Sequence, residues 1–286
     1  MFFLERLNKL DKGGVYVLRG WKLLALIGAC VMFLGGCGTE NASPKEAVKA
    51  TEQVEMTVPD KGIPVLMYHM IGVDPDDPYN QACLREENFR AQMKFLKDND
   101  FHPITMDQLY EYMVHHKPVP VRPVVLTFDD GYADTYSIVM PVMKEYGFPC
   151  TVFIPTYDAD KGTRLTWQQI EEMHDAGIQI ASHSHHHERV NEQEQGALAK
   201  DIAKSQEELK EHLGVDNAYF CYPYGANSTA AAKVLKDAGI KLAFTMNPGW
   251  AKFGDDPYAV KRIWIGNEVD MENFRQRITT EQYEQR

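Results

Sequence analysis

The chain has 286 residues, of which 44% are hydrophobic and 11% are aromatic. This composition is typical of a globular protein, and it excludes a mostly disordered or fibrous chain. A formal net charge of −11 argues against binding nucleic acid or another anionic polymer through a basic surface. The five cysteines are widely spaced and form no CxxC pair, so the sequence indicates no disulfide framework.

The N-terminal segment has the pattern of a signal peptide. Two basic residues precede an apolar run at 23–34, which is too short to span a bilayer comfortably. The sequence LGGC at 34–37 resembles a bacterial lipobox, so we expect a signal peptide over residues 1–36 and lipidation of Cys37. A plain membrane anchor and a buried apolar helix are the alternatives.

The segment after the signal peptide is polar and has little apolar periodicity. We therefore expect residues 37–61 to form a flexible, lipid-anchored linker to a single catalytic domain at 62–286. Removing residues 1–36 would take away five basic and two acidic residues, which changes the net charge from −11 to −14. The mature protein would be acidic, extracytoplasmic and attached to the cell membrane by its lipid.

Strand-like and helix-like segments alternate through the folded part. Strands are predicted at 65–68, 124–128, 150–154, 178–181, 218–222, 242–245 and 260–265. Helices are predicted at 89–96, 106–112, 136–146, 167–174, 198–213, 230–238 and near residue 274. Such alternation implies right-handed crossovers and a parallel sheet, and seven strands favour an α/β fold of the deformed (β/α)7 barrel type. An open doubly wound sheet is the alternative.

Two runs of chemically active residues follow predicted strands. The doublet Asp129-Asp130 comes directly after the strand at 124–128, and the sequence SHSHHH at 182–187 follows the strand at 178–181. Two histidines with one carboxylate can bind zinc or a related divalent ion and leave positions open for water and substrate. Alone, the doublet can be a helix cap with a turn, and the histidines a solvated surface run. Together, at the ends of neighbouring strands, they favour a metal site.

The sequence FCYPYG and His69 can each be explained by local structure when taken alone. The sequence FCYPYG at 220–225 ends a strand with aromatic residues, proline and glycine, as a rigid turn also would. His69 ends the first predicted strand, where a lone histidine is usually a packing residue. Its position at a strand end nevertheless favours a role in the site.

Three motifs occur in order along the chain: TFDDG at 127–131, HSxxH formed by His183, Ser184 and His187, and YPYG at 222–225. In this order they resemble the polysaccharide deacetylase family, carbohydrate esterase family 4, over about residues 62–280. The early sequence MYH at 67–69 resembles the branch that deacetylates poly-N-acetylglucosamine, in which the catalytic histidine motif lies at the start of the domain.

The resemblance implies a role for each matching residue. Asp129 matches the general base, and the metal ligands would be Asp130, His183 and His187, with zinc as the expected ion. His69 would protonate the leaving amine. The turn formed by Tyr222, Pro223 and Tyr224 would line the substrate groove, with the Tyr222 N–H available to the oxyanion.

The chain departs from the family pattern in two places. Cys221 stands where many members carry arginine, and no DxxDW segment follows. Arg262, at the end of a late strand, is our candidate to supply the missing guanidinium beside Asp129, and a surface arginine is the alternative. The acidic partner of His69 is not identifiable from the sequence.

The expected activity is metal-dependent hydrolysis of N-acetyl groups from an amino-sugar polysaccharide, with release of acetate, by a monomer. Poly-N-acetylglucosamine is the first candidate substrate, and peptidoglycan and chitin oligomers are the others. Two alternatives remain: an inactive glycan-binding lipoprotein, because Cys221 replaces the motif arginine, and an O-acetyl esterase acting on acetylated xylan.

Overall fold

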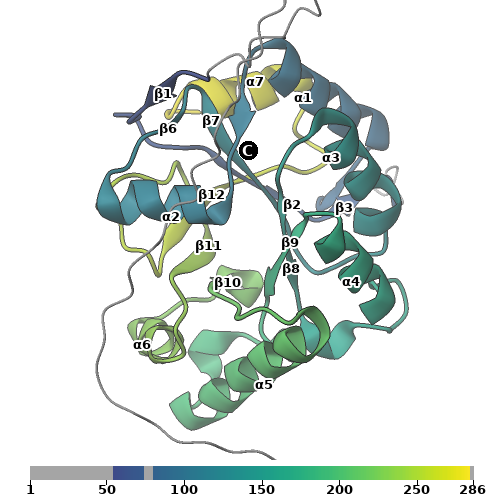
Figure 1. Cartoon of the computed structure of the whole chain (residues 1–286), viewed down its shortest axis with the longest axis vertical. Coiled ribbons are helices and arrows are strands. Elements are labelled where there is room, and N and C mark those ends of the chain that lie inside the picture. The colour runs from purple at the N-terminus through teal and green to yellow at the C-terminus, as the bar shows by residue number, and fades with distance from the viewer. Residues whose placement is uncertain (1–53, 74–79, 284–286) are drawn as a thin grey trace, which may run out of the picture. The chain divides into compact units, whose positions relative to one another are not determined.

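Seven parallel strands form a closed barrel surrounded by helices (Figure 1). The computed structural model describes residues 54–73 and 80–283. The ring runs β2–β12–β11–β10–β9–β8–β7, and β7 pairs again with β2. Each neighbouring pair in it is parallel. The predicted deformed (β/α)7 barrel is therefore confirmed, and the open doubly wound alternative is excluded.

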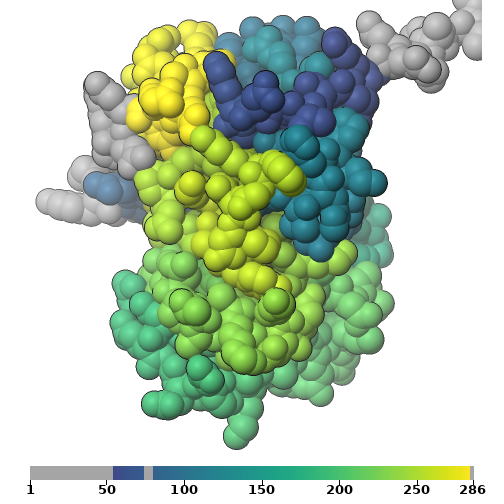
Figure 2. Space-filling model, turned by 90° about the vertical axis from the view of Figure 1, so that its left-hand side faces the viewer, coloured from purple at the N-terminus to yellow at the C-terminus, as the bar shows by residue number. Residues whose placement is uncertain are grey.

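The barrel strands are β2 (Val65–Tyr68), β7 (Pro123–Phe128), β8 (Thr151–Ile154), β9 (Gln179–Ser182), β10 (Tyr219–Cys221), β11 (Leu242–Pro248) and β12 (Val260–Trp264). The α-helices are α1 (Glu86–Asp98), α2 (Met106–His115), α3 (Met140–Tyr146), α4 (Trp167–Asp175), α5 (Gln195–Leu213), α6 (Thr229–Asp237) and α7 (Met271–Thr279). The C-terminal helix α7 packs beside α1, next to the first strand of the described chain, as the yellow and purple elements of Figures 1 and 2 show.

The hydrophobic core lies on both faces of the strands. One cluster takes buried residues from all seven barrel strands, among them Val65, Val125 and Phe153, and therefore fills the barrel interior. Their strand neighbours, such as Leu66 and Leu126, belong to a second cluster that packs under α1, α3, α4 and α7. Because both faces are covered, the strands read as apolar runs without polar alternation.

Short elements complete the fold where the sequence predicted none. Strand β1 (Met56–Thr57) pairs antiparallel with β6 (Val119–Pro120), β3 (Met70–Ile71) pairs parallel with β4 (Cys83–Leu84), and β5 (His102–Pro103) pairs with β7. The predicted helix at 136–146 begins as a π-helix, η1 (Thr135–Val139), before α3. Pro141 near the start of α3 has no backbone N–H, so a regular helix cannot run through this point.

The N-terminal predictions lie mostly beyond the described residues. The signal peptide at 1–36, Cys37 and the linker up to residue 53 are outside them. The last part of the predicted linker contains strand β1, and its Pro59 carbonyl accepts a hydrogen bond of 2.7 Å from Tyr112. Within residues 54–73 and 80–283, no helix is both long and apolar enough to cross a membrane.

Candidate active site

The predicted site residues meet at the carboxyl end of the barrel. His69 follows β2, the doublet Asp129-Asp130 follows β7, and His183 follows β9. Parallel strands present their carboxyl ends at one face, so residues far apart in the sequence become neighbours there. Arg262 joins them from β12.

Asp130, His183 and His187 form a compact set of possible metal ligands. Asp130 Oδ1 lies 3.3 Å from His183 Nε2 and 3.1 Å from His187 Nε2. One ligand atom from each residue lies within 4.8 Å of the others. Burial raises the pKa of Asp130, but hydrogen bonds from both histidines outweigh it and hold that pKa well below its usual value. One ionised carboxylate with two imidazoles fits a divalent ion such as zinc.

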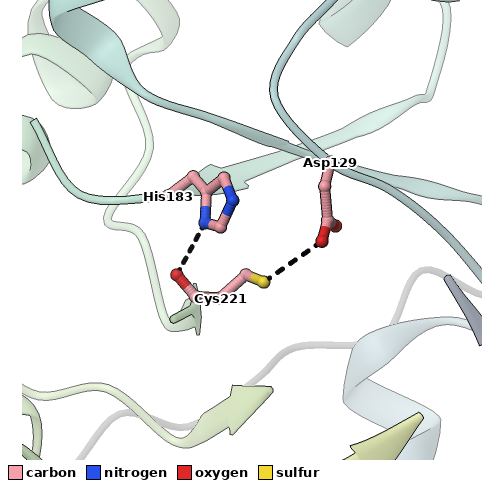
Figure 3. A group of neighbouring side chains, drawn as sticks. All are labelled: Asp129, His183 and Cys221. Atoms are coloured by element: carbon pink, nitrogen blue, oxygen red, sulfur yellow. Dashed lines mark hydrogen bonds between the residues drawn. The ribbon is translucent and has the colours of Figure 1, made fainter. Parts of the chain in front are cut away.

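His183 is oriented by the strand beside it. Its Nδ1 lies 2.7 Å from the Cys221 carbonyl oxygen, as Figure 3 shows. A carbonyl can only accept, so Nδ1 carries a proton, and Nε2, which faces Asp130, is the nitrogen that would bind a metal ion in place of its hydrogen bond to Asp130. Fixing a ligand histidine through its second nitrogen is how proteins commonly orient metal ligands.

The backbone around these ligands is unusual. Asp130, Ser184 and His187 have φ angles of 72°, 68° and 58°. Residues other than glycine rarely adopt this left-handed conformation, and such strain tends to collect at functional sites. Ser184 stabilises the histidine loop, because its Oγ accepts a 2.9 Å hydrogen bond from the His187 N–H.

Arg262 and Asp129 form a buried bidentate ion pair. Nη1 donates to Oδ1 at 2.8 Å and Nη2 donates to Oδ2 at 2.7 Å. The remaining guanidinium donors reach Thr245 O, Thr127 Oγ1 and Cys221 Sγ. Burial raises the pKa of Asp129, but Arg262 more than offsets this, so the carboxyl group stays ionised. The structure thus places Arg262 where the guanidinium was expected, and the surface alternative is wrong.

Cys221 lies between this ion pair and His183. Its Sγ is 3.4 Å from Asp129 Oδ2 (Figure 3). Asp129, His183 and Cys221 also have ligand atoms within 4.8 Å of one another. However, Arg262 Nη2 already contacts Sγ at 3.0 Å and supplies a positive charge there, while burial raises the thiol pKa. A cation therefore fits the Asp130 set better than this one.

His69 lies at the edge of the site. Its Nε2 is 3.9 Å from Asp129 Oδ2, and its ring centroid is 5.0 Å from that of Trp264. Burial lowers the pKa of His69, and the Asp129 carboxylate opposes this shift. Nδ1 is buried and has no hydrogen-bond partner among the described residues. Within residues 54–73 and 80–283, the structure therefore adds no acidic partner at Nδ1 of His69.

The turn at 222–224 differs from the prediction that all three of its residues line the substrate groove. The Tyr222 side chain is buried, and its hydroxyl donates to Tyr258 O at 3.0 Å. Its N–H donates to Phe244 O at 3.0 Å, so it is not available to an oxyanion. Pro223 is buried as well. The predictions for Tyr222 were therefore wrong, because the pairing of β10 with β11 continues past the end of β10. Of the three turn residues, only Tyr224 is half-exposed, and its ring centroid lies 4.8 Å from that of His187.

Two supporting residues were missed from the sequence. Arg164 donates to the Asp130 carbonyl at 2.8 Å, across 34 positions of the chain, and no local pattern marks it. Asp201 accepts hydrogen bonds from the backbone N–H groups of His185 and His186. Asp201 did have a signal, since it is an acidic residue on the apolar face of helix α5.

A family model agrees with this geometry. Residues 116–243 match the model of the polysaccharide deacetylase family. The matched range contains the Asp129-Asp130 doublet and the histidine loop, whereas His69 and Arg262 lie outside it.

Two proteins similar to this chain are named for their action on the same polymer. The poly-beta-1,6-N-acetyl-D-glucosamine N-deacetylase of Escherichia coli is 26% identical over 272 residues, covering 80% of this chain and 40% of that protein. The Staphylococcus epidermidis protein of the same name is 27% identical over 198 residues, which cover 64% of this chain and 68% of that protein. This chain thus spans less than half the length of the Escherichia coli relative.

A solved structure supports the fold. The Streptococcus pyogenes deacetylase PplD in complex with acetate superposes with a TM-score of 0.72 at 24% identity. The match covers 76% of this chain and 98% of that one.

Proposed function

We propose that this chain is a metal-dependent hydrolase that removes N-acetyl groups from an amino-sugar polysaccharide and releases acetate. The observation that carries the proposal is the buried Asp129–Arg262 pair beside the Asp130, His183 and His187 set. A scaffold or adhesion protein has no need for a paired buried carboxylate next to three convergent ligand atoms. Poly-N-acetylglucosamine is the preferred substrate, because the Escherichia coli and Staphylococcus epidermidis relatives carry that activity in their names.

The metal would be held by Asp130, His183 and His187, and zinc suits this donor set. When bound, such an ion polarises a carbonyl and lowers the pKa of water from 15.7 toward about 7. His183 would offer Nε2 to the ion, because its Nδ1 donates to the Cys221 carbonyl, and the Ser184 hydroxyl accepts from the His187 N–H.

Asp129 would act as the general base. Arg262 takes one lone pair of each carboxylate oxygen and the Cys221 thiol donates to Oδ2, which leaves a lone pair of Oδ1 to accept a proton from the attacking water. The ion pair keeps the carboxylate charged and fixed in direction. General base catalysis of this kind contributes about 10²- to 10⁴-fold in rate.

His69 would supply the proton that the leaving amine requires. The water oxygen forms a bond to the acetyl carbon, the amide C–N bond breaks, and its electron pair takes a proton from the imidazolium. The products are acetate and the free amine of the sugar. Burial lowers the pKa of His69, and the Asp129 carboxylate 3.9 Å from Nε2 opposes that shift.

Tyr224 would form part of the substrate groove. Its ring is 52% exposed beside His187, and an exposed aromatic ring offers an apolar face for a sugar ring. Tyr222 and Pro223 would support this turn from within.

The protein would reach its substrate as a lipid-anchored monomer outside the cytoplasmic membrane. The LGGC sequence at 34–37 supports cleavage after residue 36 and lipidation of Cys37, and residues 37–53 would link the lipid to the barrel. Labelled palmitate should enter the full chain but not a Cys37→Ala variant. Equal labelling of both would reject the anchor.

The second candidate is an inactive glycan-binding lipoprotein, since His69 Nδ1 has no acidic partner among residues 54–73 and 80–283. Acetate release by the zinc-loaded chain 38–286 distinguishes the two. We expect release from poly-N-acetylglucosamine above that from peptidoglycan, chitin oligomers or acetylated xylan. Binding without acetate release would favour the second candidate, and faster cleavage of the acetylated xylan would favour an O-acetyl esterase.

A further inference from the structure

Helix α5 carries a row of polar residues where an apolar face is expected. Leu198, Ile202 and Leu209 form its buried apolar contacts. Asp201 and Ser205 are buried on the same helix, with 9% and 0% of their surface exposed. Glu208, at the next position of the row, is 21% exposed at its side chain. Positions i, i+4 and i+7 lie on one side of a helix, and burying a carboxylate is costly unless it is hydrogen-bonded.

Asp201 and Glu208 contact the segment that joins the two ligand histidines, and Ser205 contacts Ser182, directly before His183. Asp201 Oδ2 accepts from the His185 N–H at 2.8 Å, and Oδ1 accepts from the His186 N–H at 3.2 Å. His186 Nδ1 lies 2.6 Å from the same Oδ1. Ser205 Oγ is 2.7 Å from Ser182 Oγ, and Glu208 Oε2 is 3.1 Å from His185 Nδ1.

The segment needs such support because its backbone is strained. Ser184 and His187 both adopt positive φ, so the chain between them does not hold this shape by local preference. Two successive N–H groups, of His185 and His186, point to a single carboxylate. Without that acceptor the two donors would lose their partner in a partly buried place, and the loop would relax.

We propose that Asp201 is the positioning residue of the metal centre, and that His185 and His186 attach the ligand loop to α5 rather than binding the metal. This inference rests on the proposed function, because it assigns Asp201 to the site of Asp130, His183 and His187. Ser205 extends the same attachment to Ser182, directly before His183. Partners behind metal ligands commonly change metal affinity ten- to a hundredfold when removed.

The test is zinc affinity, measured by chelator competition, in the chain 38–286 and its variants. Asp201→Ala should weaken zinc binding about ten- to a hundredfold, with acetate release recovering when zinc is raised to saturation. Asp201→Asn keeps one acceptor oxygen and should bind zinc with intermediate affinity. This milder variant also keeps the test valid if the alanine variant does not fold.

Thr105→Ala is the matched control. Thr105 caps α2 by accepting from the Gln108 N–H, and it borders a cavity with Cys150 and Ile178 at the amino ends of β8 and β9. Its loss should lower the melting temperature without changing zinc affinity. Wild-type zinc affinity in Asp201→Ala, or an equal loss in Thr105→Ala, would overturn the inference while leaving the proposed function intact. A wild-type chain that binds no zinc would overturn both.

Discussion

Arg262 and Asp129 face each other inside the barrel, 133 positions apart in the chain, with two N–O contacts of 2.7 and 2.8 Å and at most 2% exposure on either side chain. The guanidinium comes from β12, whereas the third motif carries Cys221, whose sulfur accepts from the same group at 3.0 Å. A small residue at 221 leaves the space that the Arg262 head group fills.

Replacing Arg262 by lysine should lower turnover about 100-fold or more, because an ammonium cannot hold both carboxylate oxygens of Asp129 and the base loses its orientation. Acetate release at saturating substrate measures the effect. The stability of the variant should fall too, since breaking a buried pair costs about 3–5 kcal/mol when one partner is removed outright. Unchanged turnover in a folded Arg262→Lys protein would show that the pair is structural only.

The two residues of the doublet should have different roles, with Asp129 as the general base and Asp130 as a metal ligand. Asp129→Asn should abolish acetate release while bound zinc persists, whereas His183→Ala should reduce both, because only His183 belongs to the ligand set. Metal analysis of the two purified variants, alongside a melting curve for each, separates these effects. Equal zinc loss in both would contradict the division of roles.

The two tyrosines of the third motif should respond differently to substitution. Tyr224→Ala should raise KM for a polysaccharide, since its exposed ring lies beside His187. Tyr222→Phe removes one hydrogen bond to Tyr258 O and should cost about 1 kcal/mol of stability without changing KM. Steady-state kinetics with the two variants provide the comparison, and a KM change confined to Tyr222→Phe would reverse the assignment.

Asp134 should make stability depend on pH. Burial raises the pKa of Asp134 from 3.8 to about 6, although its carboxylate accepts from the Ile71 N–H. Because the folded-state pKa lies above the unfolded one, its contribution is fully present below about pH 4 and is lost as pH rises through about 6. The change should be about 3 kcal/mol at most.

Asp134→Asn provides the control for this titration. Urea unfolding at several pH values between 4 and 7 should show that the variant lacks the decline seen in the wild-type chain. Parallel curves for the two proteins would mean that another group titrates in this range.

The sequence predicted the barrel strands because their physical signal is local. β2 begins and ends where its apolar run does, since all four of its residues are buried. Two-residue strands such as β1 carry no periodicity, and their pairing depends on distant partners such as β6. No sequence pattern contained these pairings.

The types of ligand residue in the site were predictable from the sequence, but the directions in which side chains and backbone groups point were not. Position at strand ends was enough to bring Asp130 together with His183 and His187, because parallel strands end at one face. The direction of Tyr222 depends on how far β10 pairs with β11, which only the folded backbone decides. Arg164 donates to Asp130 from a loop, and no motif in the sequence predicts this contact.

Anomalous diffraction at the zinc edge, from crystals of the zinc-loaded chain 38–286, tests the central claim most directly. The account predicts one peak at about 2.0–2.2 Å from a carboxylate oxygen of Asp130 and from Nε2 of His183 and His187. A peak between Asp129, His183 and Cys221, or none near the histidine loop, would contradict it.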